Sequence, residues 1–268
     1  MIPIVPPKIT IVTPSYNQGK FLERTILSVI NQNYPNLEYI LIDGGSTDNS
    51  LQIIKKYQKY FTYYQIKKDH GQSDAIQQGF DRSTGKIMGW LNSDDILLPG
   101  SLQLIGQLFS QNKQLNWLTS QSFIINDSDH IVRTGIQFGK SRFFARLGFY
   151  HGKFLGFIPQ EGTFWTRKLW LKSGATVPQK NQVMDFRLWQ KFAIYSPLVN
   201  LEAPLAAFRL QPNQKTSSHT EYYREINPLL VYLPYLFRLV GRIYAPISRL
   251  IYPRIYFSRP QNKWIFKL

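Results

Sequence analysis

The fold is decided by the stretch Lys86-Ile87-Met88-Gly89-Trp90-Leu91-Asn92-Ser93-Asp94-Asp95, where a short apolar run ends in two adjacent carboxylates. The apolar part is typical of a buried strand, and the polar part is typical of the turn that follows one. Mg²⁺ and Mn²⁺ prefer oxygen ligands and are commonly held by one or two carboxylates together with phosphate oxygens of a substrate. The stretch therefore favours a strand that ends at a divalent-cation site for a diphosphate. A solvated turn or helix cap before Pro99-Gly100 is the alternative.

The composition limits the class of protein. The chain has 268 residues, of which 43% are hydrophobic, so it fits one domain with an appendage. It contains no cysteine, which excludes disulfides and thiolate metal ligands and suits a reducing cytosol. Residues 1–8 lack the charged and apolar regions of a secretory signal, so we do not expect export.

The chain is strongly basic, with a formal net charge of +16. Three kinds of partner would account for this charge: nucleic acid, an anionic membrane surface or anionic substrates. Part of the excess lies towards the C-terminus, since the residues from Asn200 onward include ten basic and three acidic side chains.

The first third of the chain alternates short apolar runs with segments of helical period, which predicts successive β-α-β units. The apolar runs are at 9–13, 39–42, 63–66 and 86–91, and the helical segments are at 21–30, 51–60 and 73–82. Strands that are continuously apolar indicate a sheet covered on both faces, so we expect an α/β fold with a mostly parallel sheet. Polar residues follow each strand and should meet at one edge of the sheet.

The remaining chain has less regular patterns. Short strands are predicted between Asn116 and Ile136, and two short helices at 168–173 and 183–195. Between them, from Lys140 to Phe157, aromatic and basic residues are interleaved. The motifs GxGxxG and GxxxxGK[ST] are absent, so dinucleotide and P-loop sites are not supported.

Five ordered motifs resemble the inverting glycosyltransferases of family 2, which have the Rossmann-like GT-A fold. The motifs are Ile11-Val12-Thr13-Pro14-Ser15-Tyr16-Asn17, the segment 27–35, Ile42-Asp43-Gly44-Gly45-Ser46-Thr47-Asp48, Asp69-His70-Gly71-Gln72-Ser73-Asp74-Ala75 and Leu91-Asn92-Ser93-Asp94-Asp95. The resemblance is strong over 8–110, moderate over 160–192 and 208–217, and absent over about the last forty residues.

The resemblance implies a nucleotide-sugar site at the ends of the first strands. Pro14, Tyr16, Asn17 and Asp43 inherit the contacts to base and ribose. A tyrosine ring also offers a stacking face to a base. The residue-level alternative for Asp43 is a turn acid before two glycines.

Further acids complete the implied donor site. Asp69 resembles the second base contact, and Asp74 falls in the segment that closes over ribose and diphosphate. Asp74 is also favourable simply as a first-turn acid of a helix. Asp94 and Asp95 match the DXD-type motif, in which Asp94 contacts ribose and metal and Asp95 binds Mn²⁺ or Mg²⁺ directly.

Inverting transfer needs a base that takes the proton from the acceptor hydroxyl. Met184-Asp185-Phe186-Arg187-Leu188-Trp189 resembles the start of the helix that carries the base, so Asp185 is the candidate. Glu161 lies in the acceptor-side segment and is a second, weaker candidate. The alternatives are a first-turn acid for Asp185 and a turn residue for Glu161.

The sequence departs from the family pattern in three ways. It lacks the Gln-x-x-Arg-Trp motif of processive members, which favours transfer of a single sugar. Phe208-Arg209-Leu210-Gln211-Pro212 has glutamine where many relatives have histidine, and Gly44 replaces a commoner acid. Arg209, Lys215 and Thr216 are expected as donors to the diphosphate.

We expect residues 1–226 to form a GT-A catalytic domain, with a nucleotide-sugar half at 8–110 and an acceptor half at 111–226. Residues 227–268 are expected to form a basic, aromatic, amphipathic helical segment on a membrane surface. Its apolar run at 229–237 is too short to span a bilayer. Packing of this segment on the domain or on a partner is the alternative.

The sequence thus predicts an inverting, metal-dependent glycosyltransferase at the inner face of the cell membrane. It would move one sugar from a nucleotide-sugar, with UDP favoured and GDP and dTDP open, to a hydroxyl of a glycan or lipid-linked acceptor in cell-surface polysaccharide synthesis. A basic nucleic-acid-binding module and a non-catalytic membrane scaffold are the competing interpretations. The sequence does not identify the sugar, the acceptor, the linkage or the oligomeric state.

Overall fold

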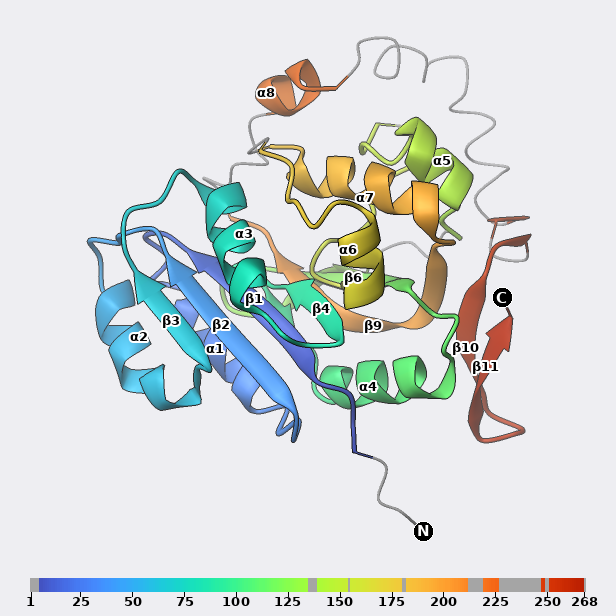
Figure 1. Cartoon of the computed structure of the whole chain (residues 1–268), viewed down its shortest axis with the longest axis horizontal. Coiled ribbons are helices and arrows are strands. Elements are labelled where there is room, and N and C mark those ends of the chain that lie inside the picture. The colour runs from blue at the N-terminus through green and yellow to red at the C-terminus, as the bar shows by residue number, and fades with distance from the viewer. Residues whose placement is uncertain are drawn as a thin grey trace.

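Strand β1 (Ile9–Ser15) lies near the middle of the sheet and is buried along its whole length. The computed structural model describes residues 5–134, 139–153, 155–179, 182–211, 219–226, 247–248 and 251–267. Within these residues the sheet has eleven strands, in the order β11-β10-β9-β6-β8-β4-β1-β2-β3, with β5 on β9 and β7 on β6. Helices cover both of its faces (Figure 1).

The first four strands are parallel, as the repeated β-α-β pattern predicts. β1 pairs with β2 and β4, and β2 pairs with β3. The bounds are β2 (Leu37–Asp43), β3 (Tyr63–Ile66) and β4 (Ile87–Trp90), connected through α1 (Leu22–Ile30), α2 (Ser50–Tyr57), the 3-10 turn η1 (Gln58–Tyr60) and α3 (Gln72–Arg82). The carboxyl ends of these strands therefore meet at one edge of the sheet.

The second half of the sheet is mixed, so the expected mostly parallel order holds only for the first half. Strand β8 runs antiparallel to both β4 and β6, whereas β9 runs parallel to β6. The bounds are β5 (Ile96–Leu97), β6 (Trp117–Ile125), β7 (Ile131–Thr134), β8 (Thr163–Thr166) and β9 (Val199–Arg209). The helices of this half are α4 (Ser101–Gln111), α5 (Arg142–Leu147), α6 (Arg167–Lys172), α7 (Met184–Tyr195) and α8 (His219–Arg224).

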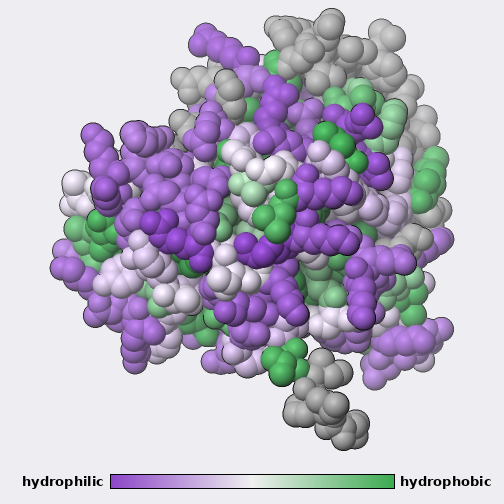
Figure 2. Space-filling model, in the orientation of Figure 1, coloured by the Kyte–Doolittle hydropathy of each residue, from purple (hydrophilic) through white to green (hydrophobic). Residues whose placement is uncertain are grey.

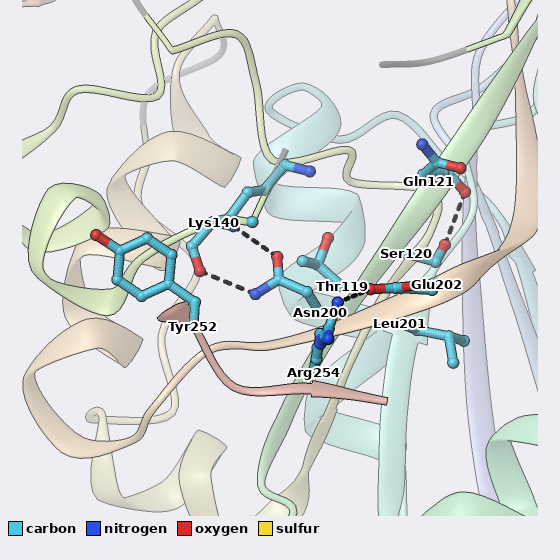
Figure 3. Close-up of a pocket in the computed structure, with 10 residues that line it drawn as sticks. Thr119, Ser120, Gln121, Lys140, Asn200, Leu201, Glu202, Tyr252 and Arg254 are labelled. Carbon is cyan, nitrogen blue, oxygen red and sulfur yellow. Dashed lines mark hydrogen bonds and ion pairs between the residues drawn. The ribbon is translucent and has the colours of Figure 1, made fainter. Parts of the chain in front are cut away.

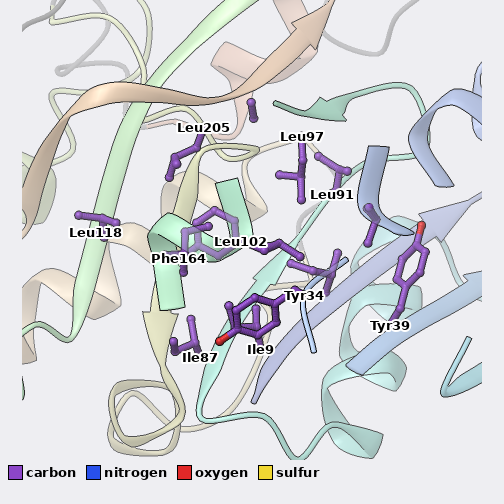
Figure 4. Packing of buried hydrophobic residues seen from close by; sticks show 14 of the residues in the cluster. Ile9, Tyr34, Tyr39, Ile87, Leu91, Leu97, Leu102, Leu118, Phe164 and Leu205 are labelled. Carbon is purple, nitrogen blue, oxygen red and sulfur yellow. The ribbon is translucent and has the colours of Figure 1, made fainter. Parts of the chain in front are cut away.

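Two hydrophobic clusters lie on opposite faces of the sheet, because alternate residues of β1 point to opposite sides. Ile9 and Ile11 pack with α1, α2 and α4, as Figure 4 shows in part. Val12 packs on the other side with α3, α6 and α7. Four tryptophans of this second cluster contact one another: Trp90, Trp117, Trp165 and Trp189. Both faces of the central strands are therefore covered, and the carboxyl edge remains for a site.

The end of the chain is part of the sheet. β10 (Arg254–Ser258) pairs parallel with β9, and β11 (Lys263–Lys267) pairs antiparallel with β10. The expected amphipathic helix is therefore wrong for Arg254–Ser258, while residues 227–246 lie outside the described residues. Among the residues that the structure describes, no helix combines the length and apolar character needed to cross a bilayer.

Candidate active site

Side-chain hydrogen bonds join the loops that follow β1 and β2. Asn17, with a positive φ of 50°, donates its backbone N–H to Ser46 Oγ at 2.8 Å. Its side-chain oxygen accepts from the backbone N–H of Thr47 at 2.8 Å. Asn17 therefore has a structural role in the loop, whether or not it also touches a nucleotide.

Asp43 is fully buried at the end of β2. Its Oδ1 accepts from the backbone N–H groups of Gly45 and Ser46 at 3.1 and 2.8 Å, and its Oδ2 accepts from Ser46 Oγ at 2.6 Å. The carboxylate thus closes the turn, as the alternative interpretation expects. Lone pairs remain on the two oxygens, since a carboxylate accepts about four hydrogen bonds.

The loops after β2 and β3 approach each other closely at Gly44. A Cβ added to Gly44 would lie 2.9 Å from Asp69 Oδ2. Asp69 Oδ1 accepts from the backbone N–H of Gly71 at 2.8 Å, which holds its side chain in this place. The replacement of an acid by glycine at position 44 therefore has a steric reason, since it leaves room for the Asp69 carboxylate beside the loop after β2.

The other expected donor-side residues lie in the same group of loops. Pro14 is buried within β1 and pairs with Ile42, whereas the ring of Tyr16 is 61% exposed and free to stack. Asp74 Oδ2 accepts from the backbone N–H of His70 at 3.0 Å and from Gln78 Nε2 at 2.9 Å. Asp74 therefore stabilises the start of α3, as the alternative interpretation expects.

The loop after β4 carries the two adjacent acids. Asp95 is fully buried, and its Oδ1 accepts from the backbone N–H of Arg209 at 2.9 Å. Asp94 is half-buried, and its Oδ2 accepts from Gln211 Nε2 at 2.6 Å. Burial raises the pKa of Asp95, and the nearby carboxylates of Asp94 and Glu161 raise it further.

Gln211 and Arg209 hold this loop through contacts that the sequence does not predict. Gln211 stands where many relatives have histidine, and it contacts Asp94 directly. Arg209 is fully buried, and its Nε and Nη1 donate to the backbone oxygens of Asp94 and Asn126 at 2.7 Å each. Its Nη2 forms an ion pair with Asp129. The guanidinium is thus bound by the protein, which does not match the expected role as a diphosphate donor.

A side-chain hydrogen bond also links the loops after β3 and β4. Gln72 Nε2 donates to Asn92 Oδ1 at 2.8 Å and so links the loop after β3 to the loop after β4. Sequence reasoning singled out neither side chain. Lys215 and Thr216 lie outside the described residues.

The acceptor-side acids lie close to the acid pair. Asp185 is half-buried in the first turn of α7, and burial raises its pKa to about 6. Burial also raises the pKa of Glu161, and the carboxylates of Asp185 and Asp94 add to this rise, while a hydrogen bond with Ser122 opposes it. Glu161 therefore lies close enough to Asp94, Asp95 and Asp185 for their charges to act on one another.

A buried lysine lies beside this group of acids. Lys140 has its backbone N–H and oxygen bonded to the side chain of Asn200, at 2.7 and 3.0 Å. Figure 3 shows its side chain extending away from Asn200, in a small pocket also lined by Glu202 and Arg254. Burial lowers the pKa of Lys140 to about 8, and the charge of Glu161 opposes this shift. Lys140 thus supplies positive charge to the acid group.

The acid pair fits a divalent cation. Within the described part of the chain, no group of three or more His, Asp or Glu side chains is placed to hold a metal ion. Two carboxylates suffice, however, for an ion that also binds substrate phosphates. Burial and the charges of Asp94 and Glu161 raise the pKa of Asp95 despite the hydrogen bonds from Arg209 and Asn92, and a cation bound there would favour the ionised carboxylate. Asp94 and Asp95 therefore have suitable donor chemistry.

Curated proteins with similar sequences are glycosyltransferases. The chain is 28% identical over 188 residues to an uncharacterized glycosyltransferase of Nostoc sp., covering 68% of this chain and 56% of that protein. It is 34% identical to the poly(ribitol-phosphate) beta-N-acetylglucosaminyltransferase TarP of Staphylococcus aureus, covering 41% and 34%. It is 31% identical to the GalNAc(5)-diNAcBac-PP-undecaprenol beta-1,3-glucosyltransferase of Campylobacter jejuni, covering 38% and 34%. The chain spans about half the length of the first two relatives it matches, 56% and 47%.

Solved structures share the fold. Staphylococcus aureus TarS in complex with UDP-GlcNAc has a TM-score of 0.63 at 15% identity, covering 81% of this chain and 64% of that chain. The mannosyltransferase PcManGT from Pyrobaculum calidifontis in complex with GDP-Man and Mn²⁺ has a TM-score of 0.60 at 15% identity, covering 92% and 74%. These likenesses confirm the expected GT-A architecture. The sequence profile described as Glycosyl transferase family 2 matches residues 10–172, and the chain belongs to this family.

Proposed function

We propose that the chain is an inverting, metal-dependent glycosyltransferase that moves one sugar from a nucleotide-sugar to a hydroxyl of an acceptor. The observation that carries the proposal is the grouping of Asp94, Asp95, Glu161 and Asp185 at the carboxyl edge of the sheet. These residues come from three separate segments of the chain, and a stable fold alone gains nothing from placing four acids together. Family membership supports the same conclusion.

Asp185 is the proposed base. Its carboxylate would take the proton of the acceptor hydroxyl while the acceptor oxygen forms a bond to the anomeric carbon. The bond from that carbon to the diphosphate breaks on the opposite face, so the nucleoside diphosphate leaves and the configuration inverts. A carboxylate with a pKa near 6 remains ionised at neutral pH and is a stronger base than an ordinary aspartate. Glu161 is more deeply buried than Asp185 and is therefore the weaker candidate.

The loops after β1, β2 and β3 are the proposed donor site. Tyr16 offers an exposed ring on which a base can stack, and Asp43 and Asp69, from neighbouring loops, have acceptor oxygens for ring N–H groups. A UDP-sugar is the donor that we favour, since TarS is solved with UDP-GlcNAc. GDP stays open, because PcManGT is solved with GDP-Man.

Asp94 and Asp95 would hold Mn²⁺ or Mg²⁺, which when bound offsets the charge on the departing diphosphate. Asp94 is the less buried acid of the pair, since it is half-buried whereas Asp95 is fully buried. Arg209 keeps both acids in place through the Asp94 backbone oxygen and the Asp95 carboxylate. Its proposed role is therefore positioning rather than contact with the diphosphate.

For the acceptor we propose a glycan or lipid-linked sugar of cell-surface polysaccharide synthesis. Two relatives support this, since one is named for poly(ribitol-phosphate) and the other for a PP-undecaprenol substrate. An acceptor of this kind places the reaction at the inner face of the cell membrane, with the protein bound there peripherally. Single-sugar transfer is proposed because the Gln-x-x-Arg-Trp motif is absent from the sequence.

The test is calorimetric binding of UDP, GDP and dTDP with and without Mn²⁺, on the natural chain and on Asp94→Asn. Binding of one nucleotide that needs Mn²⁺, and that weakens at least about tenfold in Asp94→Asn, would support the proposal. Asp81→Asn is the matched control, because Asp81 is an exposed acid on α3. Absence of binding to all three nucleotides would contradict the proposal.

A further inference from the structure

The positive charge of the chain is distributed unevenly. Residues 8–110, which include the proposed donor site, contain ten basic and nine acidic side chains, whereas residues 111–268 contain 22 basic and seven acidic ones. A nucleotide-sugar site therefore does not account for the excess. Such an asymmetry indicates a second, anionic partner for the C-terminal part.

Basic and apolar side chains are exposed together around helix α5. Phe143 is 62% exposed and Leu147 42%, and they lie four residues apart, so they share one face of the helix. Arg142 and Arg146 are exposed and also lie four residues apart. We call these four residues together with Lys153, Phe157, Ile194 and Tyr195 the α5 surface.

The exposure of Phe143 and Leu147 is fixed by the packing of α5. Ser141 caps the helix by accepting from the backbone N–H of Phe143 at 3.1 Å, and Ala145 is buried on the inner face. Phe144 packs edge-to-face on Phe149, with ring centroids 5.5 Å apart. The inner side of α5 is thus filled, and its outer side presents large apolar groups to solvent, which usually marks an interaction site.

The α5 surface lies on the same pair of packed helices, α5 and α7, as the proposed base. Helix α5 packs along α7, where Gln190 Nε2 donates to the backbone oxygen of Arg146 at 3.3 Å. Asp185 lies nine residues before Ile194 on α7, a distance of about 14 Å along the helix axis. Phe157 packs against Tyr222, with ring centroids 6.0 Å apart. Burial raises the pKa of Tyr222, and the nearby charge of Asp185 raises it further. A partner on the α5 surface therefore binds the helix that carries the proposed base, about 14 Å from Asp185 along α7.

Figure 2 shows hydrophobic side chains next to hydrophilic ones over the area that α5 and the end of α7 occupy in Figure 1. Interfacial segments that bind lipid combine Phe or Leu with Arg or Lys, because the apolar groups enter the bilayer boundary and the cations meet anionic headgroups. A soluble polyanion without aromatic bases gains from the cations but not from Phe143 and Leu147, and the aliphatic Leu147 offers no stacking face to a nucleic-acid base.

We propose that the α5 surface docks the protein on an anionic lipid membrane. This extends the proposed function, since it brings Asp185 to acceptors that are anchored in the membrane. It differs from the expectation based on the C-terminal segment, because it rests on α5, the loop to Phe157 and the end of α7. Docking itself requires neither donor nor metal, so it is testable apart from the transfer reaction.

The test is sedimentation of the full chain with vesicles of neutral phosphatidylcholine, alone or mixed with anionic phosphatidylglycerol, without any nucleotide. One double variant removes two cations, Arg142→Gln with Arg146→Gln. The other removes two apolar groups, Phe143→Ser with Leu147→Ser. Matched controls are Lys55→Gln with Lys59→Gln, two exposed cations at α2 and η1, and Ile131→Ser with Val132→Ser, two apolar residues of β7 that are 55% and 54% exposed. Circular dichroism melting checks that each variant folds.

We expect binding to the anionic vesicles only. The arginine variant should bind about 30-fold more weakly, since each cation near the surface contributes about a fivefold factor. The Phe143 and Leu147 variant should bind at least about tenfold more weakly, and the controls should bind like the natural chain. The proposal fails if the natural chain does not bind anionic vesicles, or if the α5 variants bind no more weakly than the controls.

A third measurement separates a lipid surface from a soluble polyanion. Polyphosphate binding that equals vesicle binding, and that falls with the arginines but not with Phe143 and Leu147, would overturn the lipid assignment in favour of a polyanionic partner. Nucleotide binding measured on the same α5 variants should be unchanged. If the natural chain bound no nucleotide, that result would count against the glycosyltransferase proposal. The conclusion from the vesicle experiment would be unaffected.

Discussion

Trp90 and Trp189 stack with ring centroids 5.7 Å apart and an angle of 14° between the rings. Trp90 is the last residue of β4, directly before the loop with Asp94 and Asp95. Trp189 lies one helical turn after Asp185 on α7. The stack therefore connects the proposed metal acids to the proposed base through buried aromatic rings.

Trp189→Leu should lower the free energy of unfolding by about 3 kcal/mol, because a buried ring that packs on three other tryptophans is lost. The turnover rate should fall more than donor affinity does, since the donor loops do not include α7. Denaturant unfolding and steady-state kinetics measure the two effects. Trp264→Leu on β11 is the control, and there only stability should change. A fall in donor affinity that matched the fall in turnover would contradict the linking role.

The ratio kcat/KM should rise with pH around a midpoint near 6. Burial raises the pKa of Asp185 to about 6, and only the ionised carboxylate takes a proton from the acceptor. A pH-rate profile between about pH 5 and 8 measures the midpoint. An acidic limb centred near the ordinary aspartate value would mean that another group is the base.

Asp185→Asn should abolish transfer yet raise the melting temperature at pH 7.5. The folded pKa lies above the unfolded one, so ionised Asp185 costs stability fully above about pH 6, and this cost disappears as the pH falls from about 6 to the unfolded pKa. The gain in melting temperature should therefore be small near pH 3.5. Thermal melts at the two pH values, with Asp81→Asn as the control, check the sign. An equal gain at both values would not fit this account.

Gly44→Ala should weaken donor binding by about tenfold, because its Cβ would lie 2.9 Å from Asp69 Oδ2 and would displace that carboxylate. Gly100→Ala is the control for stability. Gly100 has a φ of 79° with open space around it, so alanine there costs about 1 kcal/mol of backbone strain and touches nothing. Calorimetry of nucleotide binding should separate the two variants. Equal binding by both would show that Asp69 does not contact the base.

Arg209→Lys should destabilise the fold by about 3 kcal/mol, since lysine cannot reach the backbone oxygens of Asp94 and Asn126 and the Asp129 carboxylate at once. The Mn²⁺ dependence of nucleotide binding should shift to higher concentration, because the acid loop loses its support. Lys20→Arg serves as the control: Lys20 pairs with Asp127 on the same turn but is exposed. An unchanged Mn²⁺ dependence would limit Arg209 to a role in stability.

Local patterns were enough to predict the first half of the sheet. The apolar runs at 9–13, 39–42 and 63–66 fall within β1, β2 and β3. β1 and β2 are buried on both faces, so their consecutive residues are apolar. Helix α4 is not predicted from the sequence. The glycine inside it, Gly106, is explained by packing, since a Cβ there would lie 2.4 Å from the Tyr34 hydroxyl oxygen.

The expected acids Asp94, Asp95 and Asp185 each lie close enough to Glu161 to interact with its charge, but the residues that hold the acid loop are not predictable from the sequence. Arg209 and Gln211 contact residues more than a hundred positions away in sequence, and a single sequence carries no sign of such pairs. The resemblance identifies the segment 208–212, but it does not indicate that the Arg209 guanidinium contacts Asp94, Asn126 and Asp129. Arg209 was therefore assigned to the diphosphate, whereas the protein itself occupies its donors.

The sequence of the last strands has the alternation of a β-strand, although a helix is expected there. Arg254 and Tyr256 alternate with Ile255 and Phe257, and such alternation has the period of a strand. The turn before β11 includes Pro260 and Asn262, whose φ of 48° suits a tight turn. The abundance of basic and aromatic residues outweighed this periodicity in the sequence interpretation.

The hairpin also determines where the chain can be shortened. Asn200 donates its backbone N–H to the Pro253 oxygen at 2.9 Å, and its side chain bonds both Pro253 and Lys140. A protein cut after residue 226 would leave the first residues of β9 without β10 beside them and would expose hydrogen-bonding groups that favour edge-to-edge aggregation. Crystallisation or screening with a shortened enzyme should therefore retain the residues up to 267, even though they lie far from the acids in sequence.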